Sequence, residues 1–274
     1  MLLLSVPSDR LQTPGRPADW PAAFQIAAAS LALMVVGLAL ERAGGFLGPM
    51  SRALTSGAVH AGFFGLGWVL GEGGRPGWRG PVIRLGATVV VASLASRVVP
   101  WGAIAYLAVP AVLLVEVRRR GGFGHIGFTC PNGHAVGLGV AAGLFLGVHL
   151  IVTASLTLGY AVRMGSTAAY LSAIAYDICV SAVTVEWLFR GAIFSWAWRS
   201  WEFVPAAALA TALAVVRYLV DPNLPATPEV WLGSAFYTAL VGVSACVLRA
   251  WSGSLLPGYL ATVTFFLAYR ALGN

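Results

Sequence analysis

The chain has 274 residues, of which 58% are hydrophobic and 10% are charged. Soluble globular domains carry roughly 25% charged residues, so this composition excludes a soluble enzyme, a disordered chain and a disulfide-built secreted domain. The formal net charge is +7, and all 17 basic residues are arginines, which fall mostly at the ends of apolar segments. That placement is typical of residues that orient a membrane protein, and it argues against a nucleic-acid partner.

Nine apolar segments are long enough to be interpreted as membrane spans, since a span needs about 20 apolar residues. Runs of this length do not alternate as barrel strands do, so we expect helices. In chain order the predicted spans are 22–40, 53–71, 82–99, 101–116, 135–158, 168–198, 203–220, 230–250 and 254–271. The predicted fold is an all-α, polytopic membrane protein with about eight or nine transmembrane helices. About four of them lie in residues 1–120, and a second part covers 121–274.

Local signals support several boundaries. Asp19 is placed to cap the first helix, with Pro21 in its first turn. The span 82–99 is the weakest, because it carries arginines near both ends. Only Pro100 separates it from the next span, so we expect a tight hairpin there. The polar stretch 121–134 is rich in Gly, Pro and Asn and predicts a structured loop.

The arginines predict an orientation, because the cytoplasmic side of a membrane protein is enriched in basic residues. With the N-terminus inside, the inner segments contain Arg10, Arg16, Arg75, Arg79, Arg118, Arg119, Arg120, Arg199 and Arg249. The outer segments contain Arg42, Arg52, Arg97, Arg163 and Arg270. We therefore predict a cytoplasmic N-terminus, in the cytoplasmic (inner) membrane of a bacterium, with the lipid bilayer as its surroundings.

Several spans contain closely spaced glycines. Gly62, Gly65 and Gly67 fall in the second span, and Gly137 and Gly139 in the fifth. No strand precedes either group, so phosphate-binding loops are disfavoured and helix-packing surfaces are favoured.

Ionisable residues within a span are costly and are therefore functional candidates. They are His60, His149, Asp177, Glu186, Arg190 and Arg217. Glu186 and Arg190 are spaced i, i+4, which brings two side chains together on one face of an α-helix. Counting the α-helical rise from the predicted span ends puts His60, His149, Glu186 and Arg217 in one layer. The favoured interpretation is a charge-balanced polar cluster. A zinc site is disfavoured because Arg190 and Arg217 would repel a cation, so no metal or cofactor is predicted.

The stretch VEWLFRGAIFSWAW, from Val185 to Trp198, resembles the first motif of the CPBP family. These intramembrane proteases are related to the CAAX prenyl endopeptidases, and some bacterial members are linked to bacteriocin self-immunity. Their motifs are Glu-Glu-x-x-x-Arg, then Phe-x-x-x-His one span later, then His-x-x-x-Asn or His-x-x-x-Asp in the last span. SLLPGYLATVTFF, from Ser254 to Phe266, resembles the third-motif helix, and GHIGFTCPN resembles a short segment before the core. The resemblance covers about residues 121–271 and implies a CPBP-like core there.

The motif positions carry other residue types in this chain. Arg190 matches the motif arginine, and Glu186 matches the second glutamate. The four positions that would carry the family's catalytic groups are occupied by Val185, Arg217, Thr262 and Phe266. General-base chemistry needs a group that takes a proton. Val and Phe cannot do so, Arg stays charged and Thr is a poor base.

The resemblance with these substitutions predicts a catalytically degenerate member. Such a protein would act as a non-proteolytic subunit or scaffold that binds another membrane protein, a lipid or a hydrophobic peptide. The alternative is an active intramembrane protease that uses Glu186 with His149 or His60. A small transporter lined by Asp177, Glu186 and Arg217 is a third interpretation, disfavoured because no inverted repeat is evident.

Overall fold

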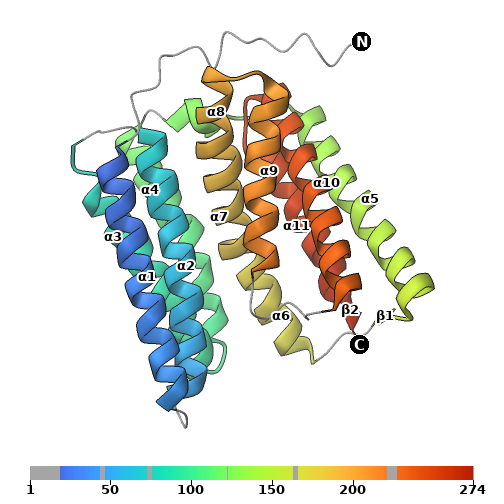
Figure 1. The fold of residues 1–274 in the computed structure, drawn as a ribbon, viewed down its shortest axis with the longest axis horizontal. Coiled ribbons are helices and arrows are strands. Elements are labelled where there is room, and N and C mark those ends of the chain that lie inside the picture. The colour runs from blue at the N-terminus through green and yellow to red at the C-terminus, as the bar shows by residue number, and fades with distance from the viewer. Residues whose placement is uncertain are drawn as a thin grey trace. The chain divides into compact units, whose positions relative to one another are not determined.

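A computed structural model describes residues 19–43, 47–72, 76–121, 123–162, 166–220 and 227–273. Almost all of them are helical (Figure 1). The extended segments within these ranges are β1 (Ala161–Val162) and β2 (Leu272–Gly273), which pair antiparallel over two residues each. The predicted all-α fold class is therefore confirmed.

Residues of the chain are grouped into two compact units that are not continuous in sequence. The N-terminal unit contains the described residues from Asp19 to Phe123 together with Ser166–Leu188. The C-terminal unit contains the described residues of Gly124–Gly165 and Phe189–Asn274. The long helical segment from Thr167 to Ser200 thus contributes its first part to one unit and its last part to the other.

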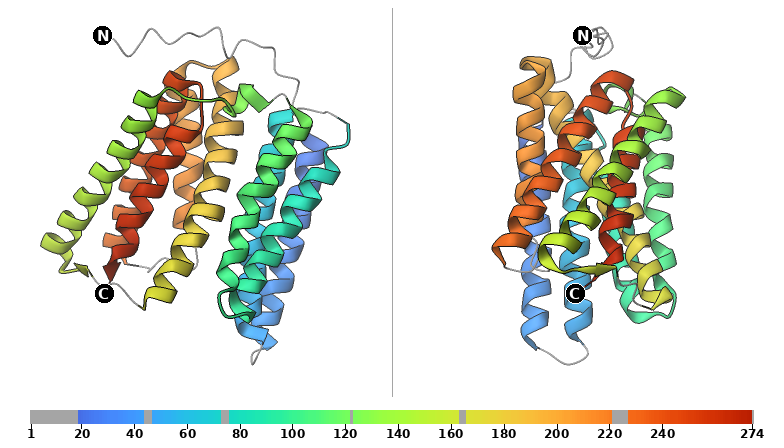
Figure 2. Two further views of the ribbon diagram at one scale, coloured as in Figure 1. Left: turned by 180° about the vertical axis from the view of Figure 1, so that it is seen from behind. Right: turned by 90° about the vertical axis from the view of Figure 1, so that its right-hand side faces the viewer.

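The N-terminal unit is built on long helices that lie side by side (Figures 1 and 2). Its first four helices are α1 (Trp20–Ala43), α2 (Leu47–Glu72), α3 (Arg79–Val98) and α4 (Ala108–Arg120). The helix α2 packs between α1 and α3. The predicted cap of α1 is confirmed, since the Asp19 carboxylate accepts a hydrogen bond of 3.0 Å from the amide of Ala22.

Helices α3 and α4 are joined by the tight connection that Pro100 predicts. A short 3₁₀ helix, η2 (Gly102–Leu107), fills the connection. Trp101 starts it with φ 63°, the one positive φ of a non-glycine residue in the described ranges. Gly102 lies directly against the carbonyl of Ala95, so that a Cβ at this position would overlap the α3 backbone. Glycine is required here because it allows the chain to return this closely onto α3.

The segment 167–200 alternates between α- and π-helix. It consists of α6 (Thr167–Tyr176), η4 (Asp177–Ala182), α7 (Val183–Val185), η5 (Glu186–Phe194) and α8 (Ser195–Ser200). The two η elements in this stretch are π-helical. A π-helix bonds residue i to i+5 and so changes which side chains share a face. The predicted span 168–198 is helical, as expected. The α-helical spacing of side chains assumed for it does not hold over η4 and η5.

The C-terminal unit contains α5 (Gly133–Leu158), α9 (Phe203–Leu219), α10 (Pro228–Ser252) and α11 (Leu256–Ala271). It also includes most of η3 (Phe123–Ile126), a short 3₁₀ helix in the loop before α5. The helix α11 packs against α5 and α10, and α10 packs against α9 (Figure 2). The amide side chain of Asn132 caps α5 by accepting a hydrogen bond of 2.7 Å from Ala135.

Most of the predicted packing glycines lie at helix contacts. Gly62 faces Ser30, Gly65 faces Ile26 and Gly67 faces the indole of Trp187. Gly139 faces the backbone of Pro257 in α11. Gly137, by contrast, has open space where a Cβ would lie, so the packing prediction is wrong at this position. The α5 contact with α11 continues instead through Gly143 and Gly147.

Six helices of the described residues are long and apolar enough to cross a membrane. Their ranges are Trp20–Arg42, Met50–Glu72, Arg79–Val98, Gly133–Leu158, Thr167–Ser200 and Pro228–Ser252. Many large apolar side chains on these helices are exposed, as expected for a chain surrounded by lipid. With 13, 17 and 16 residues, α4, α9 and α11 are shorter than the roughly 20 residues of a full span. The number of eight or nine spans therefore stays a prediction.

Four of the arginines used to predict the orientation lie outside the described residues. They are Arg10, Arg16, Arg75 and Arg163.

Candidate functional site

A network of short hydrogen bonds includes His60, inside the N-terminal unit. The imidazole is buried, and both of its nitrogens are hydrogen-bonded. Nδ1 lies 2.7 Å from Thr184 Oγ1, and Nε2 lies 2.6 Å from the Tyr176 hydroxyl. Ser56 Oγ extends the chain at 3.0 Å from the same hydroxyl. The helix α2 supplies Ser56 and His60, whereas the other two residues come from the segment 167–185.

The directions of these hydrogen bonds follow from Thr184. Its hydroxyl donates to the backbone carbonyls of Val180 and Ser181, at 2.8 and 3.0 Å, and so accepts from His60 Nδ1–H. The neutral imidazole then has a free lone pair on Nε2, which accepts from the Tyr176 hydroxyl. We assign His60 this tautomer. With both nitrogens engaged, the ring is held as a structural connector between two helices.

His149 has a different environment in the C-terminal unit. It is exposed on α5, about two thirds of the way along the helix. Its Nδ1 lies 2.7 Å from the Tyr237 hydroxyl of α10 and 3.4 Å from Thr153 Oγ1. His60 and His149 belong to different units. The predicted layer of His60, His149, Glu186 and Arg217 includes residues of both units, so this layer stays a prediction.

Glu186 and Arg190 are both buried, at 2% and 1% exposure. They lie in the π-helical element η5, whose wider turn still leaves residues four and five apart on about one face, so the predicted pairing of Glu186 with Arg190 stays a prediction. The guanidinium of Arg190 lies beside Gly242 of α10, where a Cβ would come within 2.8 Å of Nη2 and 3.1 Å of Thr211 Oγ1. Gly242 thus leaves room for the Arg190 head group between α9 and α10.

Two of the motif-equivalent positions contact one aromatic ring. The guanidinium carbon of Arg217 lies 4.5 Å from the centroid of the neighbouring Tyr218 ring. The ring of Phe266, on α11, meets the same tyrosine edge-on, at 6.0 Å between centroids. Arg217 and Phe266 therefore belong to a packed cation–aromatic contact within the C-terminal unit. The other two positions, Val185 and Thr262, are buried at 2% exposure each.

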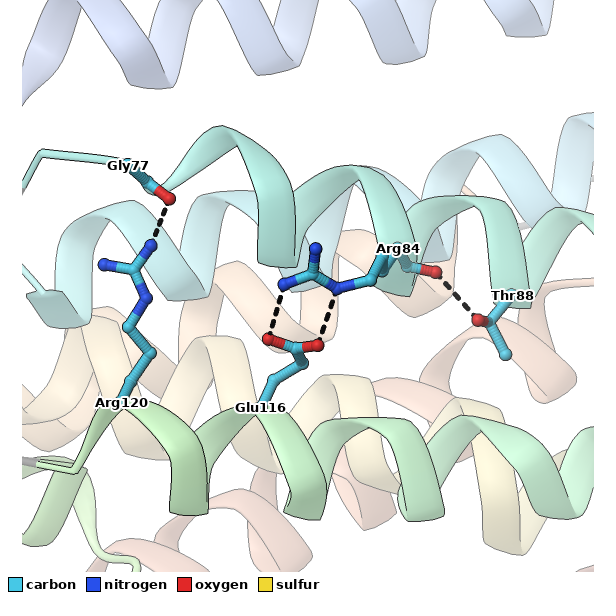
Figure 3. Close-up of polar contacts among 5 residues, drawn as sticks. All are labelled: Gly77, Arg84, Thr88, Glu116 and Arg120. Carbon is cyan, nitrogen blue, oxygen red and sulfur yellow. Dashed lines mark hydrogen bonds and ion pairs between the residues drawn. The ribbon is translucent and has the colours of Figure 1, made fainter.

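An ion pair that sequence reasoning missed joins α3 to α4 (Figure 3). Arg84 donates from Nε to Glu116 Oε1 at 2.6 Å and from Nη2 to Oε2 at 2.8 Å. The Glu116 side chain is 4% exposed and that of Arg84 53%. Nearby, Arg120 Nη1 lies 3.8 Å from Glu72 Oε1 and donates to the carbonyl of Pro76, while Nη2 of the same arginine donates to the carbonyl of Gly77. These contacts fix the α3–α4 hairpin at one end.

Trp187, within the motif-like stretch, was also missed. Its indole N–H donates to the backbone carbonyl of Phe64 at 3.0 Å, and its ring contacts those of Trp68 and Phe123. This buried aromatic cluster joins α2 to the segment 167–188. The signal in the sequence is the place of Trp187 in the middle of the predicted span 168–198, away from the span ends where tryptophans are usual.

Among the residues that the structure describes, no three His, Cys, Asp or Glu side chains are arranged as they would be around a metal ion. No family model, curated protein or solved structure matches this chain.

Proposed function

We propose that this chain is a non-proteolytic integral membrane protein of CPBP type, with eight or nine transmembrane helices, that acts as a subunit or scaffold for another membrane protein. The observation that carries the first part is the contact of Arg217 and Phe266 with Tyr218. In the CPBP resemblance these positions would hold a histidine and an asparagine. Here the two positions hold an arginine and a phenylalanine, neither of which takes a proton, packed against Tyr218.

The histidines support the same interpretation. Each is within 2.7 Å of a tyrosine hydroxyl, Tyr176 for His60 and Tyr237 for His149. His60 uses both nitrogens in holding α2 to the segment 167–185. These contacts favour a structural role of the histidines over activation of water.

The surface around His149 supports binding of a partner. This residue lies about 5 Å from the middle of α5, at a rise of about 1.5 Å per residue. Phe145, Val148, Val152 and Leu156, around it on α5, are all exposed and apolar. A polar ring that faces lipid at this depth is unfavourable, and polar residues within spans usually face other protein segments. The partner that fits is a transmembrane helix with a polar side chain opposite His149.

The first test is a peptidase assay with purified protein on membrane-anchored and prenylated peptides, with and without zinc. We expect no turnover from the native chain. The Glu186→Gln variant is expected to change stability or assembly alone. A peptidase rate that Glu186→Gln abolishes would overturn the proposal in favour of an active protease with a rearranged site.

The second test is a pull-down of the tagged protein in mild detergent, followed by mass spectrometry. We expect one membrane protein to co-purify with the native chain in stoichiometric amount. The same protein should not co-purify with the His149→Leu variant. The matched control is His134→Leu, the same substitution at an exposed position in the first turn of α5. A protein that purifies alone, or a partner retained equally by both variants, would contradict the scaffold proposal.

A further inference from the structure

Arg249 is a fully buried arginine in the last turn of α10, in the C-terminal unit. Its Nη2 donates to the backbone carbonyl of His125 at 2.8 Å and to Ser195 Oγ at 3.4 Å. Its Nε is buried and has no hydrogen-bond partner among the described residues. The side chain therefore connects the loop before α5 to α8, but its charge is not neutralised by these contacts.

A second arginine lies at the same end of the unit. Arg199 is in the last turn of α8, one helical turn after Ser195 and thus on the same face as the hydroxyl that Arg249 contacts. The ends of α8 and α10 share a buried cluster that includes Ala197 and Ala250. Arg199 is close enough for its charge to repel that of Arg249, and its Nε is also buried without a hydrogen-bond partner among the described residues.

Within the described ranges, neither the Arg199 nor the Arg249 guanidinium forms an ion pair with a carboxylate. The ion pairs of Arg84 with Glu116 and of Arg120 with Glu72 both lie within the N-terminal unit. A buried cation without a counter-charge is costly, and a second cation beside it adds repulsion. An anion bound to both would remove the repulsion and supply the missing hydrogen-bond acceptors.

We propose that Arg199 and Arg249 form a binding site for a phosphate group at the ends of α8 and α10. Guanidinium groups suit this ligand, because their planar set of donors matches phosphate oxygens. Both arginines lie in the last turn of a membrane-crossing helix, at the level where lipid head groups are found. The phosphate can come from an anionic phospholipid or from the free ion. The site is independent of the proposed scaffold role, since it contains none of the motif-equivalent positions.

The test measures phosphatidylglycerol retained by the purified protein in detergent, by native mass spectrometry, with phosphatidylcholine as the neutral comparison. We expect the native chain to retain phosphatidylglycerol selectively. Arg199→Gln should lower its affinity about five-fold, the factor expected for loss of one arginine near a lipid phosphate. Arg42→Gln is the matched control, because it removes an exposed arginine from the last turn of another span, α1, and should leave retention unchanged.

A parallel measurement distinguishes the two sources of phosphate. Inorganic phosphate is added to lipid-free protein, and the melting temperature is recorded for the native chain and for Arg199→Gln. A rise that only the native chain shows assigns the site to the free ion, whereas selective lipid retention without such a rise assigns it to the head group. Equal behaviour of the native chain and Arg199→Gln in both measurements overturns the proposal. Arg249→Lys serves as the second variant, because it keeps the buried charge but loses the planar set of donors, and it should lower phosphatidylglycerol retention as Arg199→Gln does.

Discussion

The carboxylate of Glu116, in α4, is bound through both of its oxygens by one arginine. Arg84 binds both of its oxygens, yet the arginine is half exposed and the glutamate is buried. Removing Arg84 therefore leaves a buried acceptor without its donors, while solvent screening limits the loss. We expect Arg84→Gln to lower the free energy of unfolding, measured by reversible denaturation in mixed micelles.

A control on the same helix is Arg97→Gln, because Arg97 is exposed at the other end of α3. Its effect should stay within about 0.5 kcal/mol. The double variant Arg84→Gln, Glu116→Gln should be less destabilised than the sum of the two single variants, since the two residues contact each other. Additive effects would show that the ion pair contributes nothing to stability.

The hydroxyl of Tyr176 is the central atom of the His60 hydrogen-bond chain. It lies within hydrogen-bond distance of both His60 Nε2 and Ser56 Oγ. Tyr176→Phe keeps the ring and leaves a buried imidazole nitrogen without a donor, which costs about 1–3 kcal/mol. Thermal unfolding in detergent should show a clear decrease for this variant. Tyr269→Phe, at an exposed position of α11, should show no decrease in thermal stability. Equal stability of the two variants would contradict the hydrogen bonds assigned to His60.

At the scale of elements, glycines decide how closely α5 approaches α11. A Cβ on Gly143 would overlap the carbonyl of Ala261 and the hydroxyl of Thr264. We expect Gly143→Ala to force the helices apart and to destabilise the protein by about 1–3 kcal/mol, the range for overpacked positions. Gly137→Ala is a matched control on the same helix, because open space lies at its Cβ position.

The two alanine variants should change the stability of the protein in opposite directions. Gly137→Ala gains helix propensity of up to about 1 kcal/mol without meeting a neighbour. The midpoint of thermal unfolding for each variant checks this directly. A Gly143→Ala protein as stable as the native chain would show that α5 and α11 are not in close contact.

The elements themselves could largely be predicted from the sequence. Long apolar runs, a capping aspartate and Pro100 predict helices and a hairpin that the structure contains. The π-helical stretches could not be predicted, because nothing in the residue types from Asp177 to Phe194 distinguishes i+5 from i+4 bonding. The predicted pairing of Glu186 with Arg190 lies in the second of these stretches and stays a prediction.

The candidate site was predicted in part. Residue types alone identify Arg217 and Phe266 as unable to act as bases, but their common contact with Tyr218 depends on how α9 and α11 pack. The contact of Arg84 with Glu116 could have been predicted from the position of each residue along its helix. Arg84 is about 7.5 Å into α3 and Glu116 about 6 Å before the end of α4, so a hairpin brings them to one level.

At the scale of the whole molecule, the orientation of the protein in the membrane can be measured by labelling one cysteine. Cys130 is exposed, whereas Cys179 and Cys246 are buried. It lies in the loop that follows Arg118, Arg119 and Arg120, which the charge rule assigns to the cytoplasm. A membrane-impermeant maleimide should therefore label the protein in inside-out vesicles and not in intact cells. Labelling of intact cells would reverse the orientation.

The division of the N-terminal unit between two stretches of chain has a consequence for its biosynthesis. Ser56 and His60 find their partners 116 to 124 residues later, after α5 of the other unit has been made. At synthesis rates of about 5–20 residues per second, Tyr176 is made about 6–23 s after His60. During that interval the polar ring of His60 depends on water, lipid head groups or the insertion machinery. A factor that shields polar residues of unfinished membrane proteins from lipid is therefore expected to act on this chain. It would act after α2 has left the ribosome and before α7 has done so.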